Sequence, residues 1–473
     1  MNICKIMIML CINTSMGSSV MARYLAGLVS LALLAGCAGF SRDGGMDNVR
    51  TTVAQKLQKD VALPSDDASV PGHLDELLAS SLDVESAVQV ALLNNRGLQA
   101  RFAELGIAES DLVQAGRLPN PKFSMLYARH DGEYKIEQSF AFNIFSLLTM
   151  PQARKIEQRR FEQVQREVSL DILTLAQATR QAWIQAVAAE QSVLYAAQVM
   201  QAAEAAAELA RDMQKQGNWS KLDQAREHGF YAEAALEYAS ARETQVVMRE
   251  RLSRLLGMTD STRLKLPQRL PDLPSQEGEL LQVQQQAFMQ RLDLQSMRLE
   301  AEALASQLGL SKATRLVNVL EIGPARVLEG RRSEAYKKGI VLGFELPLFD
   351  WGNAKVKRAE FIYKQALDNI AQATVNAESE VRTAYARYHI RYEMARHFQD
   401  EIVPLRQRIL QESQLRYNGM LLSAFELLAE ARTQIHSVNQ YINAVRDFWL
   451  AESVLTMSTM GPVAATETNG RGK

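Results

Sequence analysis

Two pairs of carboxylates with helical spacing are the residues of this chain whose types and positions could do chemistry. Asp223 and Glu227 are four residues apart, and so are Glu426 and Glu430. In an α-helix this spacing places both side chains of a pair on one face. Each pair is therefore either part of a solvated helix surface or a site that attracts cations, and the choice depends on how the chain assembles.

The other reactive residues give little support for metal binding or catalysis. The six histidines are scattered, and His389 and His397 do not have the i, i+4 spacing of a helical metal pair. The 18 methionines are dispersed, which favours core packing over a copper site. The sequence contains no nucleophile elbow, phosphate-binding loop or glycine-rich dinucleotide motif. We therefore expect no enzyme, no metal site and no bound cofactor. The formal net charge of −1 indicates no nucleic-acid surface.

The amino-terminal segment predicts export. Arg23 precedes a short apolar run over residues 25–35, followed by small residues, as in a secretory signal. The run is too short to cross a membrane as a helix. We expect residues 1–36 to be a signal peptide, and we suspect Met21 as the true start because a compact signal begins there.

The end of that segment predicts lipid attachment. The run Leu-Ala-Gly-Cys that ends at Cys37 resembles the bacterial lipobox, in which cleavage precedes a cysteine that is then lipidated. The alternative is a signal peptide with an incidental cysteine. Position 38 lacks the aspartate that retains lipoproteins in the inner membrane, so outer-membrane sorting is expected. Residues 37–80 show little periodicity and predict an extended, lipidated tether.

Two long helical hairpins dominate the rest of the chain. Over residues 151–258, apolar and small residues recur at spacings of three and four, the pattern of a coiled coil. The chain is expected to reverse at 216–220, so the first helix, 151–216, would be roughly 100 Å long. A second hairpin is expected over 351–459, with a kink at Pro404.

A pair of strands is expected before each hairpin. Alternating apolar residues at 123–128 and 134–144 flank an Asp-Gly pair that favours a tight turn. A weaker candidate at 316–327 and an alternating run at 340–348 form the second pair. An apolar face opposite a polar face fits a membrane β-strand, and an ordinary half-buried sheet fits it equally. The residues expected to share the apolar face include Phe140, Phe142, Leu342 and Phe344.

The order of helix, strand pair and long hairpin occurs twice. Arg180 aligns with Arg382, and Gly217 aligns with Gly419 at the same offset of about 202 positions. Such self-similarity indicates an internal duplication. The expected organisation is a first repeat at 81–258, a linker at 259–279, a second repeat at 280–460 and a disordered tail at 461–473.

Residues 80–461 resemble the outer-membrane efflux protein (TolC-like) family. The markers are Leu82-Asp83 at the start of a helix, the run GRLPNP at 116–121, the duplication, and the stretch 417–431. The resemblance implies a mainly α fold with a small β part. Duplicated α-helical hairpins would form a coiled-coil tunnel, and four strands per chain would complete a trimeric membrane β-barrel. It also indicates a lipoprotein branch of the family.

The family's partners and location follow from the same resemblance. It implies a homotrimer in the bacterial outer membrane, in contact with its lipid, with a tunnel that extends into the periplasm. The tunnel would dock on a periplasmic adaptor protein and an inner-membrane efflux pump, and would conduct substrates passively. Metal ions, copper among them, are one substrate class that the resemblance suggests; the residues alone leave the substrate open.

The resemblance assigns roles to the hairpin tips. Gly217 and Gly419 permit positive φ and close approach of a partner backbone, so adaptor helices are expected to dock there against Leu222 and Leu422. Three-fold symmetry would bring the nearby acids around a narrow periplasmic mouth. The candidate mouth acids are Glu426, Glu430, Asp223 and Glu227, and the first two are preferred.

A second function class fits part of the pattern. A periplasmic coiled-coil lipoprotein, acting as an adaptor or scaffold, also carries a long α-hairpin. Adaptors have one such hairpin, whereas this chain has two in duplicate, each after a strand pair. This difference favours the export duct.

Overall fold

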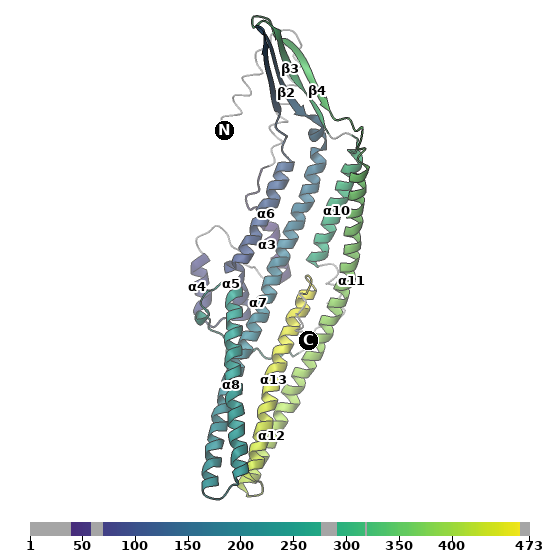
Figure 1. Ribbon diagram of the computed structural model, residues 1–473. Coiled ribbons are helices and arrows are strands. Elements are labelled where there is room, and N and C mark those ends of the chain that lie inside the picture. Colours follow the sequence, from purple (N-terminus) through teal and green to yellow (C-terminus); the bar gives the residue numbers. More distant parts are fainter. Residues whose placement is uncertain (1–38, 58–69, 276–290, 317–318, 464–473) are drawn as a thin grey trace. The chain divides into compact units, whose positions relative to one another are not determined.

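The computed structural model describes residues 39–57, 70–275, 291–316 and 319–463, and it is mainly helical with one small sheet (Figure 1). The chain divides into two compact units. The first comprises Glu109–Gln158 and Ser306–Ala359 with the residues up to Arg42, and the second comprises Asp43–Ala108, Arg159–Ala305 and Glu360–Lys473. The expected signal peptide, Cys37 and most of the expected tail lie outside the described residues.

The described helices and strands follow the order that the duplication predicts, apart from two further helices at the start. They are α3 (Met46–Leu57), α4 (Val70–Ala79), α5 (Val84–Asn94), α6 (Arg96–Ala115), β1 (Lys122–His130), β2 (Glu133–Asn143), α7 (Ile144–Lys215), α8 (Lys221–Leu255), the short η1 (Ser261–Arg263), α10 (Leu292–Ala313), β3 (Leu320–Gly330), β4 (Lys337–Phe344), α11 (Asn353–His397), the π-helical η2 (Phe398–Ile402), α12 (Val403–Asn418) and α13 (Ala424–Ser458). Among the described helices, none combines the length and apolar character needed to cross a bilayer.

The first unit contains four antiparallel strands in the order β1-β2-β3-β4. Asp131 and Gly132 reverse the chain between β1 and β2 with φ of 51° and 87°, so the turn expected from the Asp-Gly pair is confirmed. The register pairs Phe123 with Phe140, and the two rings lie 4.9 Å apart between centroids. Since directly paired residues share a face, the whole sheet can be divided into two faces.

One face of the sheet is largely apolar, apart from Arg129 and a row formed by Gln138, Arg326 and Lys338, and the other face is largely polar or small. Phe142 pairs with Ile322, which in turn pairs with Leu342, and Phe344 pairs with Leu320. The four residues expected to share the apolar face, Phe140, Phe142, Leu342 and Phe344, therefore do share it. The opposite face carries Ser124, Ser139, Ala141, Glu321 and Gly343.

The second strand pair differs in its bounds from the sequence-based expectation. β3 begins and ends later than 316–327, and β4 runs earlier than 340–348 and stops before Pro347. Pro347 has no backbone N–H to donate, so the ladder ends before it. Gly323 in β3 lies against the Phe140 backbone, where a Cβ would sit 1.7 Å from the carbonyl oxygen. Only glycine permits this close approach between β2 and β3.

The first long hairpin consists of α7 and α8. Many residues of the heptad pattern in α7 are buried, from Val168 and Ile172 to Ala203, Ala207 and Ala210. Because most of them are alanines, neighbouring helices can approach closely. The expectation that the helix begins at Pro151 was wrong: it begins at Ile144, where the Asn143 side chain accepts from the Ser146 N–H at 2.8 Å. This cap starts the helix before the proline is reached.

The second long hairpin is interrupted where the sequence predicted a kink. α11 passes into the π-helical turn Phe398–Ile402, and Pro404 stands in the first turn of α12. Proline cannot donate to the preceding helical turn, so the regular ladder breaks there. A π-helical turn accommodates one extra residue without ending the helix.

The expectation of an extended tether over 37–80 was wrong for two parts of that segment. Residues Met46–Leu57 form α3 and Val70–Ala79 form α4. Val49 and Val53, one helical turn apart, are buried in a cluster with Leu92 and Ile172. Packing against α5 and α7 stabilises α3. The sequence of this short, weakly amphipathic segment does not by itself indicate such packing.

The single helix expected between Leu82-Asp83 and the first strand pair is two helices, α5 and α6. Asp83 caps α5 by accepting from the Ser86 N–H at 2.7 Å. Asn95 then interrupts the helix: its side chain donates to the Leu255 carbonyl at 2.9 Å and accepts from the Leu98 N–H at 3.1 Å. The break therefore ties α5 and α6 to the end of α8.

Candidate functional site

The tip of the first hairpin reverses as the sequence predicts. Gly217 has φ of +77°, its N–H donates to Gln214, and the Asn218 N–H donates to the Met213 carbonyl at 2.9 Å. These two bonds make a Schellman motif with glycine in the left-handed position. Open space surrounds the position that a Cβ would take, so Gly217 lies at an accessible surface. Leu222, the second residue of α8, is 60% exposed.

The second tip uses the same motif with a different residue in the strained position. Gly419 has φ of −82°, whereas Met420 has φ of +58°. Met420 donates to the Tyr417 carbonyl, and Leu421 donates to the Arg416 carbonyl at 2.9 Å. The expectation that Gly419 supplies the positive φ was therefore wrong, and the structural equivalent of Gly217 is Met420.

This one-residue shift has a structural cause. As far as Arg382, equivalent residues of the two repeats are separated by the same number of positions as Arg180 and Arg382. Beyond η2, equivalent residues are separated by one position more. The extra residue of the π-helical turn, between Arg382 and the tip, accounts for the shift. The helix caps that follow the tips, Ser220 and Ser423, confirm the new alignment because both accept from the third residue after them.

The corrected alignment makes the two acid pairs structurally equivalent. Asp223 and Glu426 each follow a serine cap by three residues, and Glu227 and Glu430 each follow by four more. The environments of the equivalent acids nevertheless differ. Glu227 is only 1% exposed, whereas Glu430 is half-buried. The duplication therefore supplies the same acids twice, and local packing distinguishes them.

The first pair is largely used within the chain. The Glu227 carboxylate accepts from the Arg432 guanidinium at 2.6 Å, which joins α8 to α13. Arg432 also lies over the Phe230 ring at 4.4 Å. Asp223 accepts from the Ser220 hydroxyl at 2.7 Å and lies 3.5 Å from Arg226. Glu227 thus has little surface through which to meet solvent.

The second pair is more accessible. Glu426 is exposed and forms a capping box with Ser423: it accepts from the Ser423 N–H at 3.0 Å, and its own N–H donates to the Ser423 hydroxyl at 3.2 Å. Hydrogen bonds from the Ser423 backbone and side chain lower the pKa of the Glu426 carboxyl. The capping box therefore stabilises the ionised form of Glu426.

A second inter-helix contact lies close to the same ion pair. Arg226 of α8 lies over the Phe425 ring of α13 at 5.3 Å. Together with Arg432 over Phe230, each helix places an arginine on an aromatic ring of the other. Both helices are thereby joined just beyond their tips, and sequence reasoning missed these contacts because the partners are far apart in the chain.

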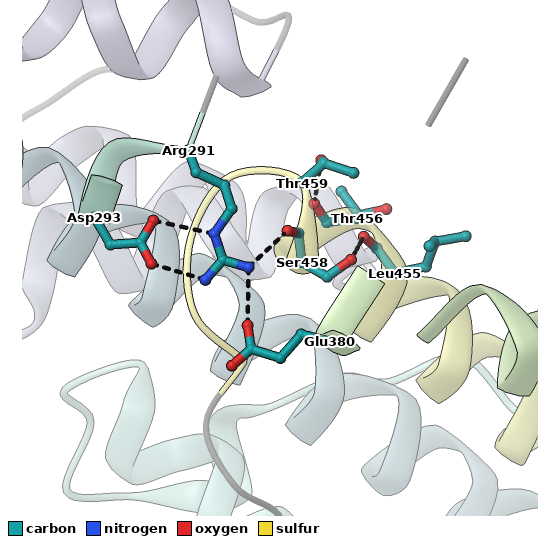
Figure 2. A network of polar contacts seen from close by, with 7 residues as sticks. All are labelled: Arg291, Asp293, Glu380, Leu455, Thr456, Ser458 and Thr459. Atoms are coloured by element: carbon teal, nitrogen blue, oxygen red, sulfur yellow. Dashed lines mark hydrogen bonds and ion pairs between the residues drawn. The ribbon is translucent and has the colours of Figure 1, made fainter. Parts of the chain in front are cut away.

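A buried polar cluster elsewhere in the same unit was also missed (Figure 2). Arg291 is 2% exposed, and its guanidinium donates to Asp293 at 2.7 Å, to Glu380 at 2.8 Å and to the Ser458 carbonyl at 3.3 Å. The cluster joins the start of α10 to α11 and to the end of α13. The buried guanidinium is fully paired, with two carboxylates and a carbonyl, so we interpret the cluster as structural. Leu292-Asp293 repeats the Leu-Asp opening of α5, which is the sequence signal that could have located it.

The described residues contain no group of three or more His, Cys, Asp or Glu side chains that could hold a metal ion. His389 and His397 each lie beside a glutamate one turn further along the helix, at 3.5 Å and 3.2 Å. Both side chains are substantially exposed, as expected for surface histidines.

Comparison with known proteins identifies the fold. No protein-family model matches the chain, and no curated protein sequence does. The solved structure of CusC, described as a transmembrane channel, is 17% identical over 80% of this chain and 92% of its own, with a TM-score of 0.66. The Campylobacter jejuni CmeC outer-membrane channel is 15% identical over 87% of this chain and 91% of its own, with a TM-score of 0.69.

A third solved structure is similar to the same extent. The open state of the Neisseria gonorrhoeae MtrE outer-membrane channel is 15% identical over 80% of this chain and 89% of its own, with a TM-score of 0.66. Because these identities are low, the likeness establishes the fold and not the residues of a site. The chain has the TolC-like channel fold, with long helices and a small four-stranded antiparallel sheet.

Proposed function

We propose that this protein is the outer-membrane channel of a tripartite efflux system, a passive export duct without catalytic activity. The main supporting observation is the four-stranded sheet with one largely apolar face, on a chain that shares its fold with outer-membrane channels. An apolar face of alternate residues is what lipid requires of a membrane strand. The soluble alternative, a periplasmic adaptor or scaffold, offers no reason for this face.

The open edges of the sheet support a homotrimer. β1 and β4 are edge strands, and lipid offers no hydrogen bonds to the backbone groups of such edges. Three copies would close the sheet into one barrel. The helices also expose large apolar side chains that an assembly would cover, including Leu236 in α8 and Phe361 in α11. We propose that these lie between protomers.

The hairpin tips are the proposed contact with a periplasmic adaptor, which in turn joins an inner-membrane pump. Leu222, Met420 and Leu421 are exposed beside the two turns, and Leu422 is half-buried. An apolar residue at an open turn is a reasonable anchor for a partner helix. We therefore propose that the adaptor contacts the tip residues expected from the sequence, which are Gly217, Leu222, Gly419 and Leu422, and also Met420.

We further propose that Glu426 and Glu430 line the periplasmic mouth in preference to Asp223 and Glu227. Glu227 is buried against Arg432, whereas Glu426 is exposed. Three copies of each acid around a narrow opening would attract cations. Metal ions remain one substrate class compatible with such a mouth.

A lipid on Cys37 would reinforce the attachment of the protein to the outer membrane.

The test is conductance of the full chain in planar lipid bilayers, together with gels of outer-membrane fractions. The proposal expects discrete channel openings and a heat-sensitive band at the mass of a trimer. Recovery of the protein as a soluble periplasmic species without conductance would favour the scaffold and overturn the channel.

A further inference from the structure

A polar pocket in the second unit is separate from the hairpin tips and from the sheet. It has a volume of about 650 Å³ and lies between α3, α7 and α10. That volume lies within the range of small-molecule sites. Its walls are formed mainly by hydroxyl, amide and charged side chains, so a polar ligand fits it better than an apolar one.

Two cationic side chains line the pocket. Lys56 comes from the last turn of α3 and Arg166 comes from α7. Burial, and next the charge of Arg166, lower the pKa of Lys56 to about 8. The lowered pKa means that the Lys56 ammonium is destabilised where it lies, and an anion in the pocket would relieve that destabilisation.

Arg166 and the helix that carries Lys56 are held in place by hydrogen bonds between α3 and α7. The Arg166 guanidinium donates to the Thr52 hydroxyl at 2.8 Å. Gln165, which is buried, donates to the Gly45 carbonyl at 3.1 Å and accepts from Asn48 at 3.4 Å. These bonds fix α3 on α7, so the helix that carries Lys56 is held beside Arg166. A site built on helices in this way is preorganised for its ligand.

The pocket has one acidic side chain, and that acid has an arginine partner that does not line it. The Glu162 carboxylate accepts from Arg159 at 2.8 Å. Arg159 also pairs with Glu302 at 3.2 Å. Among the side chains that line the pocket, two are cationic and one is acidic, and the acid is paired with an arginine outside the lining.

We infer that this pocket binds a phosphate group carried by a small polar molecule or by a lipid headgroup. A guanidinium and an ammonium together supply the charge-assisted hydrogen bonds that phosphate oxygens accept. The threonine and amide side chains around them would take up the polar remainder of the ligand. The inference is independent of the proposed channel function.

The test is calorimetric titration of the purified full chain with glycerol 3-phosphate, inorganic phosphate and glycerol. Both phosphate compounds should bind and glycerol should not. Lys56→Gln combined with Arg166→Gln should weaken binding by about tenfold or more, since two charged donors are lost. The matched control is Arg50→Gln, which removes a cation of α3 outside the pocket and should leave the affinity unchanged.

Two further measurements, on the Lys56→Arg variant and with lipid nanodiscs, complete the test. Lys56→Arg retains the charge and should retain binding, so it serves if the double variant does not fold. Anionic phosphatidylglycerol in nanodiscs should weaken the apparent affinity for glycerol 3-phosphate if a lipid headgroup is the natural ligand, relative to phosphatidylcholine discs. Equal affinity in both discs indicates a soluble ligand. Absence of phosphate binding by the unmodified chain, or equal binding by a folded double variant, overturns the inference.

Discussion

Arg432 in α13 donates to the buried carboxylate of Glu227 in α8 at 2.6 Å, across 205 positions of sequence. The two partners differ in exposure, because Arg432 is 28% exposed and Glu227 only 1%. The ion pair therefore joins the two hairpins. The buried Glu227 carboxylate depends on Arg432 for its charge to be compensated, whereas Arg432 is also in contact with solvent.

The difference in exposure predicts unequal effects of removing each partner. Arg432→Met strands a buried carboxylate and should lower the free energy of unfolding by about 3–5 kcal/mol. Glu227→Gln leaves a partly solvated arginine, and the loss should be about 1–3 kcal/mol. Denaturant unfolding followed by circular dichroism measures both. Arg226→Met, whose partner Asp223 is more exposed, is the control and should cost less than either. Equal losses for Arg432→Met and Glu227→Gln would contradict the asymmetry.

Equivalent positions in the two tips should respond in opposite directions. Gly217→Ala places a Cβ in the left-handed region and should destabilise the tip by roughly 1–2 kcal/mol. Met420→Gly removes the same strain and should stabilise the tip, offset in part by the greater freedom of glycine in the unfolded chain. Gly419→Ala, at negative φ, should be tolerated. Limited proteolysis at the tips and denaturant unfolding compare the three variants. Greater damage from Gly419→Ala than from Gly217→Ala would contradict the alignment of Gly217 with Met420.

The register of the sheet predicts a difference between its two faces. An arginine in place of Phe142 or Leu342 should cost roughly 2–4 kcal/mol if these side chains face lipid at mid-membrane. Arginine in place of Ser139 or Gly343 should be milder, because both lie on the opposite face. The measurement is the yield of heat-sensitive trimer in the outer-membrane fraction. Equal yields from both sets of variants would argue against a membrane role for the apolar face.

Lipid attachment at Cys37 is a separate prediction. Cys37→Ala should abolish labelling of the protein by a fatty-acid probe, because the thiol that carries the acyl chain is gone. Insertion of the sheet should persist, since the strands supply their own membrane contact. Labelling that continues in this variant would exclude Cys37 as the site of attachment.

The acids near the second tip predict cation selectivity, and the cap formed by Glu426 predicts a dependence of helix stability on pH. Glu426→Gln with Glu430→Gln should weaken both the cation preference and the block by divalent cations in single-channel recordings. Because the folded-state pKa of Glu426 is lowered, its cap stabilises the helix above the ordinary glutamate pKa and loses that contribution as pH falls through the lowered value. Ser423→Ala leaves both acids in place but removes the serine hydroxyl from the capping box. This variant should reduce the dependence of helix stability on pH. Unchanged selectivity in the double variant would make these acids surface residues.

Local patterns in the sequence were sufficient for most elements of the fold. The heptad spacing of α7, the alternation in β2 and the turn at Asp131-Gly132 each depend on residues close together in the chain. The side-chain period of a helix or strand is a property of its own backbone, so one segment is enough to reveal it. The duplication was visible for the same reason.

Tertiary packing decided the features that local patterns could not contain. α3 is a helix because Val49 and Val53 find a hydrophobic cluster built from α5 and α7. Glu227 differs from its equivalent Glu430 because Arg432 reaches it from another hairpin. The π-helical turn before Pro404 moved the second tip by one residue, which transferred the positive φ from Gly419 to Met420. Burial and ion pairing depend on partners brought together only by folding, so one sequence can specify equivalent acids twice and still give them different environments.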